Sequence, residues 1–297
     1  MRIVIALGGN ALLWRGEGPD AELQRANVVR VATALAPLAH DNDIVLTHGN
    51  GPQLGLLAGE SAADPALRAP YPLDLLGAQT QGLIGSLLAR ALGDALPCRR
   101  IVALLTHTLV RADDPAFGRP SKPVGRPRPG GPARPPGTGA PGTGAVRRLV
   151  PSPAPQRILE TEIVRDLLAA GTLVVCSGGG GIPVTAESGL LAGTEAIVDK
   201  DLAAARLAED LEADFLLILT DVPNVYAHFG TRDQRPVLDA TPAELRAGRY
   251  AEGSMGPKAE AAARFVERTG ALAAIGCLDA AYEIVHGRSG TLVRPGL

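Results

Sequence analysis

The sequence predicts an α/β protein in which helices cover both faces of a mostly parallel β-sheet. Two observations lead to this prediction. Short apolar runs of the kind found in buried strands alternate with segments whose apolar residues recur at helical spacing, and this alternation favours parallel strands joined by helices. Several of the apolar runs also end in glycine-rich loops. Open sheets of this kind bind their ligands beyond the carboxyl ends of the strands.

The first third of the chain shows the alternation clearly. Asp20 is placed to cap a helix in which Val28, Val31 and Leu35 recur at helical spacing. Pro52 suits the first turn of a further helix. In chain order we expect strand 2–7, loop 8–11, helix 21–38, strand 43–47, loop 48–53, helix 74–96 and strand 101–105.

Residues 118–156 break the pattern, because they are dense in proline and glycine and nearly free of large apolar residues. Such a composition predicts a segment without a packed core. The alternation then resumes, and Thr241, Pro242 and Glu244 have the spacing of a capping box. In chain order we expect helix 157–170, strand 172–177, glycine loop 178–181, helix 201–212, strand 214–219, helices after 241 and 258, and short strands near 271–277 and 291–294.

Bulk composition argues against several classes of protein. A chain of 297 residues with 46% apolar residues can bury a sizeable core, and a net charge of -2 gives no reason to expect nucleic acid or a membrane as partner. We find neither a secretory signal nor a membrane-spanning run, and expect a cytoplasmic protein. Cys98, Cys176 and Cys277 match no metal spacing, and we expect buried free thiols at all three.

Lysine is rare in this chain, since only Lys122, Lys200 and Lys258 occur among 29 basic residues. An ammonium group is a compact point charge that suits a single phosphate oxygen, whereas the arginine fork is planar. Lys200 and Lys258 stand at the starts of predicted helices, where a cation opposes the helix dipole unless an anion binds there. We therefore predict that the lysines bind phosphate. The alternative is that they are ordinary surface cations.

Four glycine-rich segments lie between predicted elements: GGNA at 8–11, HGNGPQ at 48–53, GGGG at 178–181 and GSMG at 253–256. Glycine lets backbone N–H groups approach a phosphate without a Cβ in the way. Asn10 and Asn50 either add side-chain donors or simply form turns. Asp201 either caps a helix or orients the lysines. His48 is either structural or catalytic.

Some nucleotide-binding classes are excluded by missing motifs. The chain has no G-x-x-x-x-G-K-[ST] loop, and no G-x-G-x-x-G follows a strand, which argues against P-loop and dinucleotide enzymes. The five histidines have no metal-ligand spacing, and no protein metal site is expected.

Taken together, the motifs resemble those of carbamate kinases, which belong to the amino acid kinase family. The match runs in order along the whole chain. It is carried by ALGGNA (6–11), HGNGPQ (48–53), DPAF (114–117), SKPVG (121–125), VPSPAP (150–155), GGGGIPV (178–184), DKDLA (199–203), ILTDV (218–222) and GSMGPK (253–258).

The resemblance implies a three-layer α/β/α sandwich around a mainly parallel eight-stranded sheet. It implies an N-terminal lobe, residues 1–200, that binds the acceptor, and a C-terminal lobe, residues 201–297, that binds the nucleotide. Within the first lobe, residues 118–150 would form a Pro/Gly-rich degenerate lid.

The resemblance also implies roles for particular residues. Lys200 and Lys258 would neutralise the transferring phosphoryl group, with Asp201 holding them. Lys122 would reach over the acceptor from the lid. The phosphoryl and acceptor site would be lined by Gly8, Gly9, Asn10, Gly49, Asn50 and Gly51. The nucleotide would contact Asp221, Val222, Tyr226, Met255, Gly256 and Pro257.

The implied reaction interconverts ATP and carbamate with ADP and carbamoyl phosphate, as part of arginine metabolism. Phosphoryl transfer needs positioning and charge neutralisation more than covalent help from the protein. Carbamate already presents an anionic oxygen, so no general base is required. Mg²⁺ would arrive with ATP or ADP rather than in a protein cage. The resemblance further implies a homodimer.

The lid segment departs from the family pattern. Val146 stands where carbamate kinases have Trp, although Arg147 and Arg148 remain, and residues 115–159 contain eight basic residues and no acidic one. We expect residues 126–145 to be disordered or irregular and the acceptor to be held weakly. Two other functions therefore stay open: a related kinase of another small acid or phosphate acceptor, and a nucleotide-binding regulator with weak turnover.

Overall fold

The computed structural model describes the chain except residues 14–16, 130–144, 249, 251–253 and 297, and except the side chains of residues 10, 11, 126–129, 145 and 146. Its centre is an eight-stranded sheet in which neighbouring strands run parallel apart from one antiparallel pair, β15 and β16. The spatial order is β14 (Asp239–Ala240), β16 (Thr291–Val293), β15 (Leu272–Cys277), β11 (Phe215–Thr220), β1 (Arg2–Leu7), β2 (Asp43–His48), β8 (Thr172–Val175) and β3 (Arg100–Ala103).

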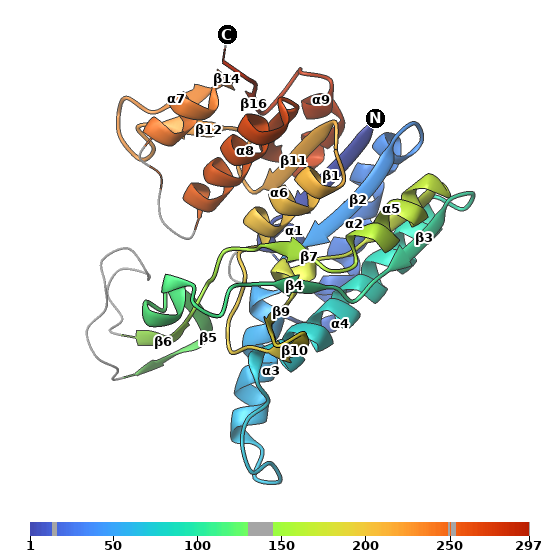
Figure 1. Ribbon diagram of the computed structural model, residues 1–297. Coiled ribbons are helices and arrows are strands. Elements are labelled where there is room, and N and C mark those ends of the chain that lie inside the picture. Colours follow the sequence, from blue (N-terminus) through green and yellow to red (C-terminus); the bar gives the residue numbers. More distant parts are fainter. Residues whose placement is uncertain (14–16, 130–144, 249, 251–253, 297) are drawn as a thin grey trace.

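Helices cover both faces of this sheet, which makes the fold a three-layer α/β/α sandwich (Figure 1). One face packs against α2 (Ala21–Ala39), α4 (Leu73–Ala95) and α9 (Ala281–Val285). The other face packs against α5 (Thr161–Ala169), α6 (Lys200–Asp210), α7 (Pro242–Ala247) and α8 (Met255–Thr269). Within β1, Ile3 and Ile5 belong to the first core and Val4 and Ala6 to the second, as the strand period of two requires. The predicted fold class is confirmed.

Helix starts follow the capping signals of the sequence. Asp20 accepts hydrogen bonds from two backbone N–H groups in the first turn of α2. Pro52 lies in the first turn of α3 (Gly51–Ala63). Thr241 and Glu244 form a complete capping box at α7. All three predicted starts are confirmed.

Several predicted boundaries are wrong, among them those of loop 8–11 and helix 157–170. Residues 8–11 are not all loop, because α1 (Gly9–Leu12) makes a single helical turn directly after β1. The predicted helix 157–170 begins only at Thr161, since residues 157–158 form strand β7 (Arg157–Ile158) and pair with β4 (His107–Leu109). The Thr161 hydroxyl donates to the carbonyl oxygen of Ile158 at 2.7 Å, which marks the turn between strand and helix.

A second sheet, in the order β10-β9-β4-β7, was not predicted. It contains β9 (Ile182–Glu187) and β10 (Leu190–Gly193), which form an antiparallel hairpin beside α4. A small two-stranded sheet of β12 (Val225–Ala227) and β13 (Arg235–Val237) was also missed. Apart from β9, these strands have only two to four residues, so their apolar pattern is too brief to identify from sequence.

Part of the Pro/Gly-rich segment is ordered, contrary to the prediction. Strands β5 (Lys122–Pro129) and β6 (Ala145–Val150) pair antiparallel, with an irregularity between Val124 and Arg128. Val124 and Val150 are buried against Leu54 in α3 and against Leu73 and Leu76 in α4. The few apolar residues of the segment therefore suffice for a small satellite core. Residues 126–145 were predicted to be disordered or irregular; residues 126–129 and 145 are instead in paired strands, although the pairing is irregular between Val124 and Arg128, and residues 130–144 lie outside the described residues.

The cysteines are only partly as expected. Cys176 is buried, Cys277 is half-buried and Cys98 is exposed, so the expected burial is wrong for Cys98. All three thiols are free. Burial raises the pKa of Cys176 to about 12, so this thiol stays protonated. In the described part of the chain, none of the helices combines the length and the apolar character needed to cross a membrane.

Candidate active site

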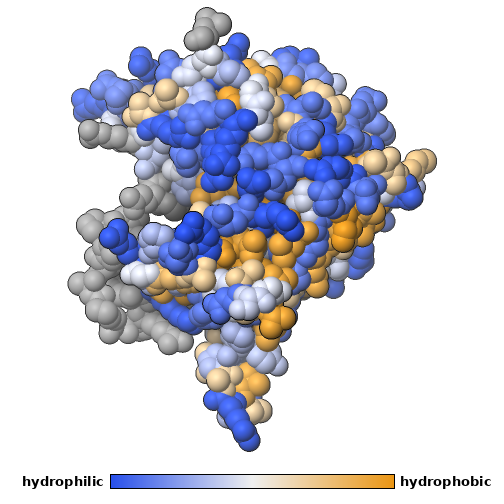
Figure 2. Space-filling view, in the orientation of Figure 1, coloured by the Kyte–Doolittle hydropathy of each residue, from blue (hydrophilic) through white to orange (hydrophobic). Residues whose placement is uncertain are grey.

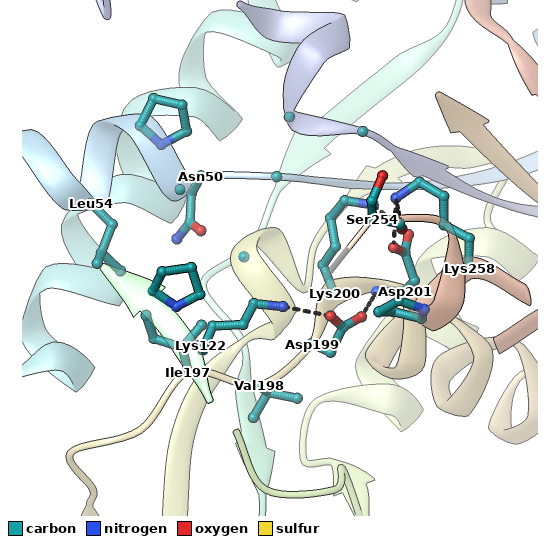
Figure 3. Close-up of a pocket in the computed structure, with 18 of the residues that line it drawn as sticks. Asn50, Leu54, Lys122, Ile197, Val198, Asp199, Lys200, Asp201, Ser254 and Lys258 are labelled. Atoms are coloured by element: carbon teal, nitrogen blue, oxygen red, sulfur yellow. Dashed lines mark hydrogen bonds and ion pairs between the residues drawn. The ribbon is translucent and has the colours of Figure 1, made fainter. Parts of the chain in front are cut away.

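A pocket of about 310 Å³ lies at the carboxyl ends of the central strands. It is lined by residues that follow β1, β2 and β11, by the first turns of α3, α6 and α8, and by β5 (Figure 3). The parallel topology explains this convergence, because the carboxyl ends of neighbouring parallel strands meet at one edge of the sheet. The glycine loops predicted to bind ligand at this edge do line the pocket, through Gly8, Gly9, Gly49, Gly51 and Gly179.

Two of these glycines are required by close backbone contacts. A Cβ on Gly8 would lie 2.9 Å from the carbonyl oxygen of Leu219, to which the Gly8 N–H donates at 2.8 Å. A Cβ on Gly49 would lie 2.9 Å from the Cα of Gly9. The floor of the pocket is therefore bare backbone from two adjacent loops, open to a phosphate-sized anion.

Asp201 joins two of the three lysines. It lies in the first turn of α6 and is only 3% exposed. Its Oδ1 accepts a hydrogen bond from Nζ of Lys200, and its Oδ2 accepts one from Nζ of Lys258 at 3.1 Å (Figure 3). Lys258 comes from α8, so this single carboxylate holds together two helices distant in the sequence.

Burial and charge oppose each other at this cluster. Burial alone would raise the pKa of Asp201, but Lys200 and Lys258 together lower it well below the ordinary value for an aspartate. Burial lowers the pKa of Lys200, and the Asp201 carboxylate opposes that effect. With two ammonium groups on one carboxylate, the cluster carries an excess positive charge at the pocket wall. An anion is the natural complement of that charge.

Lys122 approaches the pocket from β5 and donates from Nζ to Oδ2 of Asp199 at 2.5 Å. Asp199 is the N-cap residue of α6 and directly precedes Lys200. All three lysines thus line one pocket, each in contact with an aspartate of the segment 199–201 (Figure 3).

His48 and Asn50 have structural partners. His48 is 1% exposed, its Nδ1–H donates to the carbonyl oxygen of Gly49 at 3.1 Å, and burial lowers its pKa to about 4. His48 is not among the pocket-lining residues, which favours the structural alternative. Asn50 does line the pocket, but its Nδ2 donates to the hydroxyl of Thr80 at 2.9 Å.

The predicted nucleotide residues are only partly in contact with this pocket. Asp221 and Pro257 line it. Val222, Tyr226, Met255 and Gly256 do not line it, although all four belong to the segments that follow β11 or start α8. Asn10 lies in α1, and its side chain is outside the described residues.

Sequence reasoning overlooked several lining residues, of which Asp199, Thr220 and Ser254 are polar. Asp199 could have been predicted from the sequence, because an aspartate just before the start of the predicted helix 201–212 is placed to act as its N-cap. Thr220 and Ser254 gave none beyond their neighbourhood to the motifs. Among the described residues, no group of three or more His, Cys, Asp and Glu side chains has a geometry that could hold a metal ion.

With this geometry in hand, comparison with known proteins is informative. Residues 1–276 match the model of the amino acid kinase family. The chain belongs to this family.

Within this family, the chain is similar to one kind of enzyme, the carbamate kinases. A carbamate kinase of Rhizobium meliloti is 45% identical, with 99% of this chain and 93% of that protein covered. A carbamate kinase of Pyrococcus furiosus is 41% identical, with 99% of each chain covered. The solved structure of a carbamate kinase from Giardia lamblia bound to AMP-PNP superposes with a TM-score of 0.91 at 35% identity, covering 99% of this chain and 98% of that one. The resemblance stated from the sequence motifs is confirmed.

Proposed function

We propose that this chain catalyses reversible phosphoryl transfer between ATP and carbamate, giving ADP and carbamoyl phosphate. The observation that carries the proposal is the Asp201 cluster. It holds the ammonium groups of Lys200 and Lys258 at the wall of a pocket floored by glycine backbone. The full-length similarity to carbamate kinases supports carbamate as the acceptor.

In the proposed mechanism the protein positions the reactants and neutralises charge. Lys200 and Lys258 contact oxygens of the transferring phosphoryl group, whose charge spreads over its peripheral oxygens in the transition state. Asp201 keeps both ammonium groups in place before the nucleotide arrives, so little reorganisation is needed during the reaction. The backbone N–H groups that follow Gly8 and Gly49 in these loops bind the phosphate, since the N–H groups of Gly8 and Gly49 themselves donate to Leu219 and Leu7. Mg²⁺ would enter as part of the nucleotide substrate and would neutralise part of the phosphate charge.

We assign the acceptor and the nucleotide to different parts of the chain. Residues 1–200 form the lobe that binds the acceptor, and Lys122 on β5 contacts it. Residues 201–297 form the lobe that binds ATP or ADP, with the adenine near Val222, Tyr226 and Met255. The AMP-PNP complex of the Giardia lamblia enzyme supports nucleotide binding within this fold.

Assembly and location are proposed from the family resemblance and from exposed apolar surface. We propose a cytoplasmic homodimer that acts in arginine metabolism, as the resemblance to carbamate kinases implies. Exposed leucines support the dimer: Leu190 is 75% and Leu191 56% exposed on β10, and Leu75 and Leu83 are exposed on the neighbouring α4. Figure 2 shows apolar surface gathered where β9, β10 and α4 lie. Apolar patches of this kind commonly mark protein–protein contacts.

One assay tests the proposed reaction. The protein is incubated with ADP, Mg²⁺ and carbamoyl phosphate, and ATP is measured. Rapid ATP formation is the expected result. Turnover with a different acyl phosphate, but none with carbamoyl phosphate, would overturn the acceptor and support the related kinase. Binding of ADP without turnover of any acyl phosphate would support the regulator.

A further inference from the structure

Asp199 uses its two carboxylate oxygens for different partners. Oδ1 accepts hydrogen bonds from the backbone N–H groups of Asp201 at 2.9 Å and Leu202 at 3.4 Å, which caps α6. Oδ2 accepts from Nζ of Lys122 at 2.5 Å. Because the cap fixes one oxygen on the helix, the other is aimed in a defined direction, toward β5 (Figure 3).

The contact between Asp199 and Lys122 is better shielded than the ion pair that joins Arg148 of the hairpin to Glu195. The Asp199 side chain is 12% exposed and Lys122 is 32% exposed, whereas Arg148 and Glu195 are 62% and 44% exposed. Exposed ion pairs contribute little, while partly buried ones gain more from their charge. Asp199 therefore has a stronger influence on the position of the Lys122 ammonium group than the Arg148–Glu195 ion pair of β6 has.

The position of this contact matters for the pocket. Lys122, Asp199, Lys200 and Asp201 all line it, and Asp199 and Asp201 flank Lys200 in the sequence. At the first turn of α6, Asp201 thus holds Lys200 and Lys258, and Asp199 holds Lys122. An ammonium group has three N–H donors, so a hydrogen bond to Asp199 leaves two donors of Lys122 for an acceptor anion.

We propose that Asp199 is a positioning residue that holds the Lys122 ammonium beside the first turn of α6, where the acceptor binds. The inference rests on the proposed function for the identity of that acceptor. If the ion pair only attached the hairpin to α6, it would stabilise the hairpin. It would not change the KM of one substrate more than the KM of the other.

Asp199→Asn separates the two roles of this carboxylate. Asparagine caps helices about as well as aspartate, so the α6 cap remains. Its Nδ2 cannot accept a hydrogen bond from an ammonium group, so the contact with Lys122 is lost. Asp20→Asn is a matched control, because Asp20 caps α2 with the same two distances, 2.9 and 3.4 Å, and is not among the pocket-lining residues.

Steady-state kinetics provide the first test. We expect Asp199→Asn to raise KM for carbamoyl phosphate about tenfold, the usual effect of losing a charge-assisted hydrogen bond, and to leave KM for ADP within about twofold. Asp20→Asn is expected to change neither. In a Lys122→Met background, Asp199→Asn is expected to add little, since both changes remove the same interaction. Equal effects on both substrates, or independent effects of the two substitutions, would overturn the proposal.

A spectroscopic readout does not depend on turnover. Reductive methylation with ¹³C-formaldehyde labels the three lysines and the N-terminus, and Lys122→Arg identifies the Lys122 signal. We expect that signal to move in Asp199→Asn and to stay in place in Asp20→Asn. An unmoved signal overturns the inference even in an active enzyme. If the wild type makes no ATP from carbamoyl phosphate while the signal still moves, the assigned acceptor fails and the positioning role stands.

Discussion

At the scale of single residues, the candidate active site depends on the pairing of buried charged side chains with side chains of opposite charge. Asp201 is nearly inaccessible, and a buried carboxylate without partners would be strongly unfavourable. Lys200 and Lys258 supply those partners. The same contacts leave an excess of positive charge that a nucleotide phosphate can satisfy, so stability of the cluster and affinity for anions have one physical origin.

Removing either transfer lysine is predicted to lower the rate rather than nucleotide binding. Lys200→Ala and Lys258→Ala should each reduce kcat by about 100-fold or more, because a preorganised charge at the transition state is lost, with the Kd for ADP within a few-fold of wild type. Stopped-flow assays and calorimetry measure the two quantities. Arg246→Ala is a suitable control, since its partners Glu260 and Glu267 do not line the pocket. Near-normal kcat in both lysine variants would refute the mechanism.

His48 predicts a dependence of stability on pH. Burial lowers its pKa from 6.5 to about 4, so between these values the unfolded state binds more protons than the folded state. The free energy of unfolding should therefore fall as the pH falls from 6.5 to 4, by up to about 3 kcal/mol from this residue. Urea unfolding at several pH values measures the slope. His48→Gln should flatten it, and an unchanged slope in that variant would contradict the neutral buried state.

Functional residues could be predicted from the sequence where their side-chain chemistry and their immediate sequence neighbours were distinctive. Three lysines among many arginines stood out, and their convergence on one pocket follows the prediction. The partner of Asn50 could not be predicted, because Thr80 lies 30 residues away and meets it only through the packing of α4 against the loop. Asp199 was overlooked because the helix cap was considered for Asp201, whereas the structure gives that role to Asp199.

At the scale of elements, the hairpin of β5 and β6 reaches the pocket through contact with α3. The two elements approach closely at Gly55 in α3 and Gly125 in β5, where a Cβ on Gly55 would lie 3.1 Å from the Cα of Gly125. Gly125 has a φ of 78°, a conformation that favours glycine. The pair lets strand and helix touch backbone to backbone, which sets the position of Lys122 three residues earlier in β5.

Two glycines of α3 offer a matched pair of substitutions. Gly59→Ala meets nothing within 4 Å and should stabilise the protein by about 0.4–1 kcal/mol, because alanine restricts the unfolded chain. Gly55→Ala should show no such gain and should raise KM for the acceptor, since β5 must move a few tenths of an ångström. Thermal unfolding and kinetics provide the comparison. Equal behaviour of the two variants would show that the hairpin does not depend on this contact.

Element prediction succeeded where caps and long periodic segments gave local signals, as at α2, α4 and α7. It failed for the hairpin because proline and glycine dominate its composition, while its stability comes from Val124 and Val150 packing on distant helices. It failed for β7 because pairing with β4, almost 50 residues earlier in the chain, overrides a sequence pattern that also suits a helix.

At the scale of the whole molecule, the sheet brings loops from across the chain to one edge. Parallel pairing of β2, β1 and β11 aligns the carboxyl ends of these strands, near residues 49, 8 and 220, although the last two are far apart in the sequence. The sequence predicted this edge because glycine loops followed several buried strands. The second sheet and the exposed apolar surface could not be predicted, since both depend on how the finished layers pack.

If the protein is a dimer, a charged residue introduced into the contact surface should lower the mass of the particle in solution to that of a monomer. Leu191→Asp, on the exposed face of β10, should shift the protein from dimer to monomer, because a buried unpaired carboxylate opposes association. Sedimentation velocity measures the result. Phe229→Asp, which changes an apolar residue beyond β12 that is even more exposed than Leu191, should leave the dimer intact. A wild-type protein that sediments as a monomer would refute the proposed assembly.

The most direct measurement is a crystal structure with Mg²⁺ and a non-hydrolysable ATP analogue. We expect Nζ of Lys200 and of Lys258 to lie about 2.7–3.0 Å from oxygens of the terminal phosphates, with the phosphates bound at the loops that follow Gly8 and Gly49. Phosphates bound elsewhere, with both ammonium groups still engaged only by Asp201 or turned to solvent, would contradict the proposed mechanism.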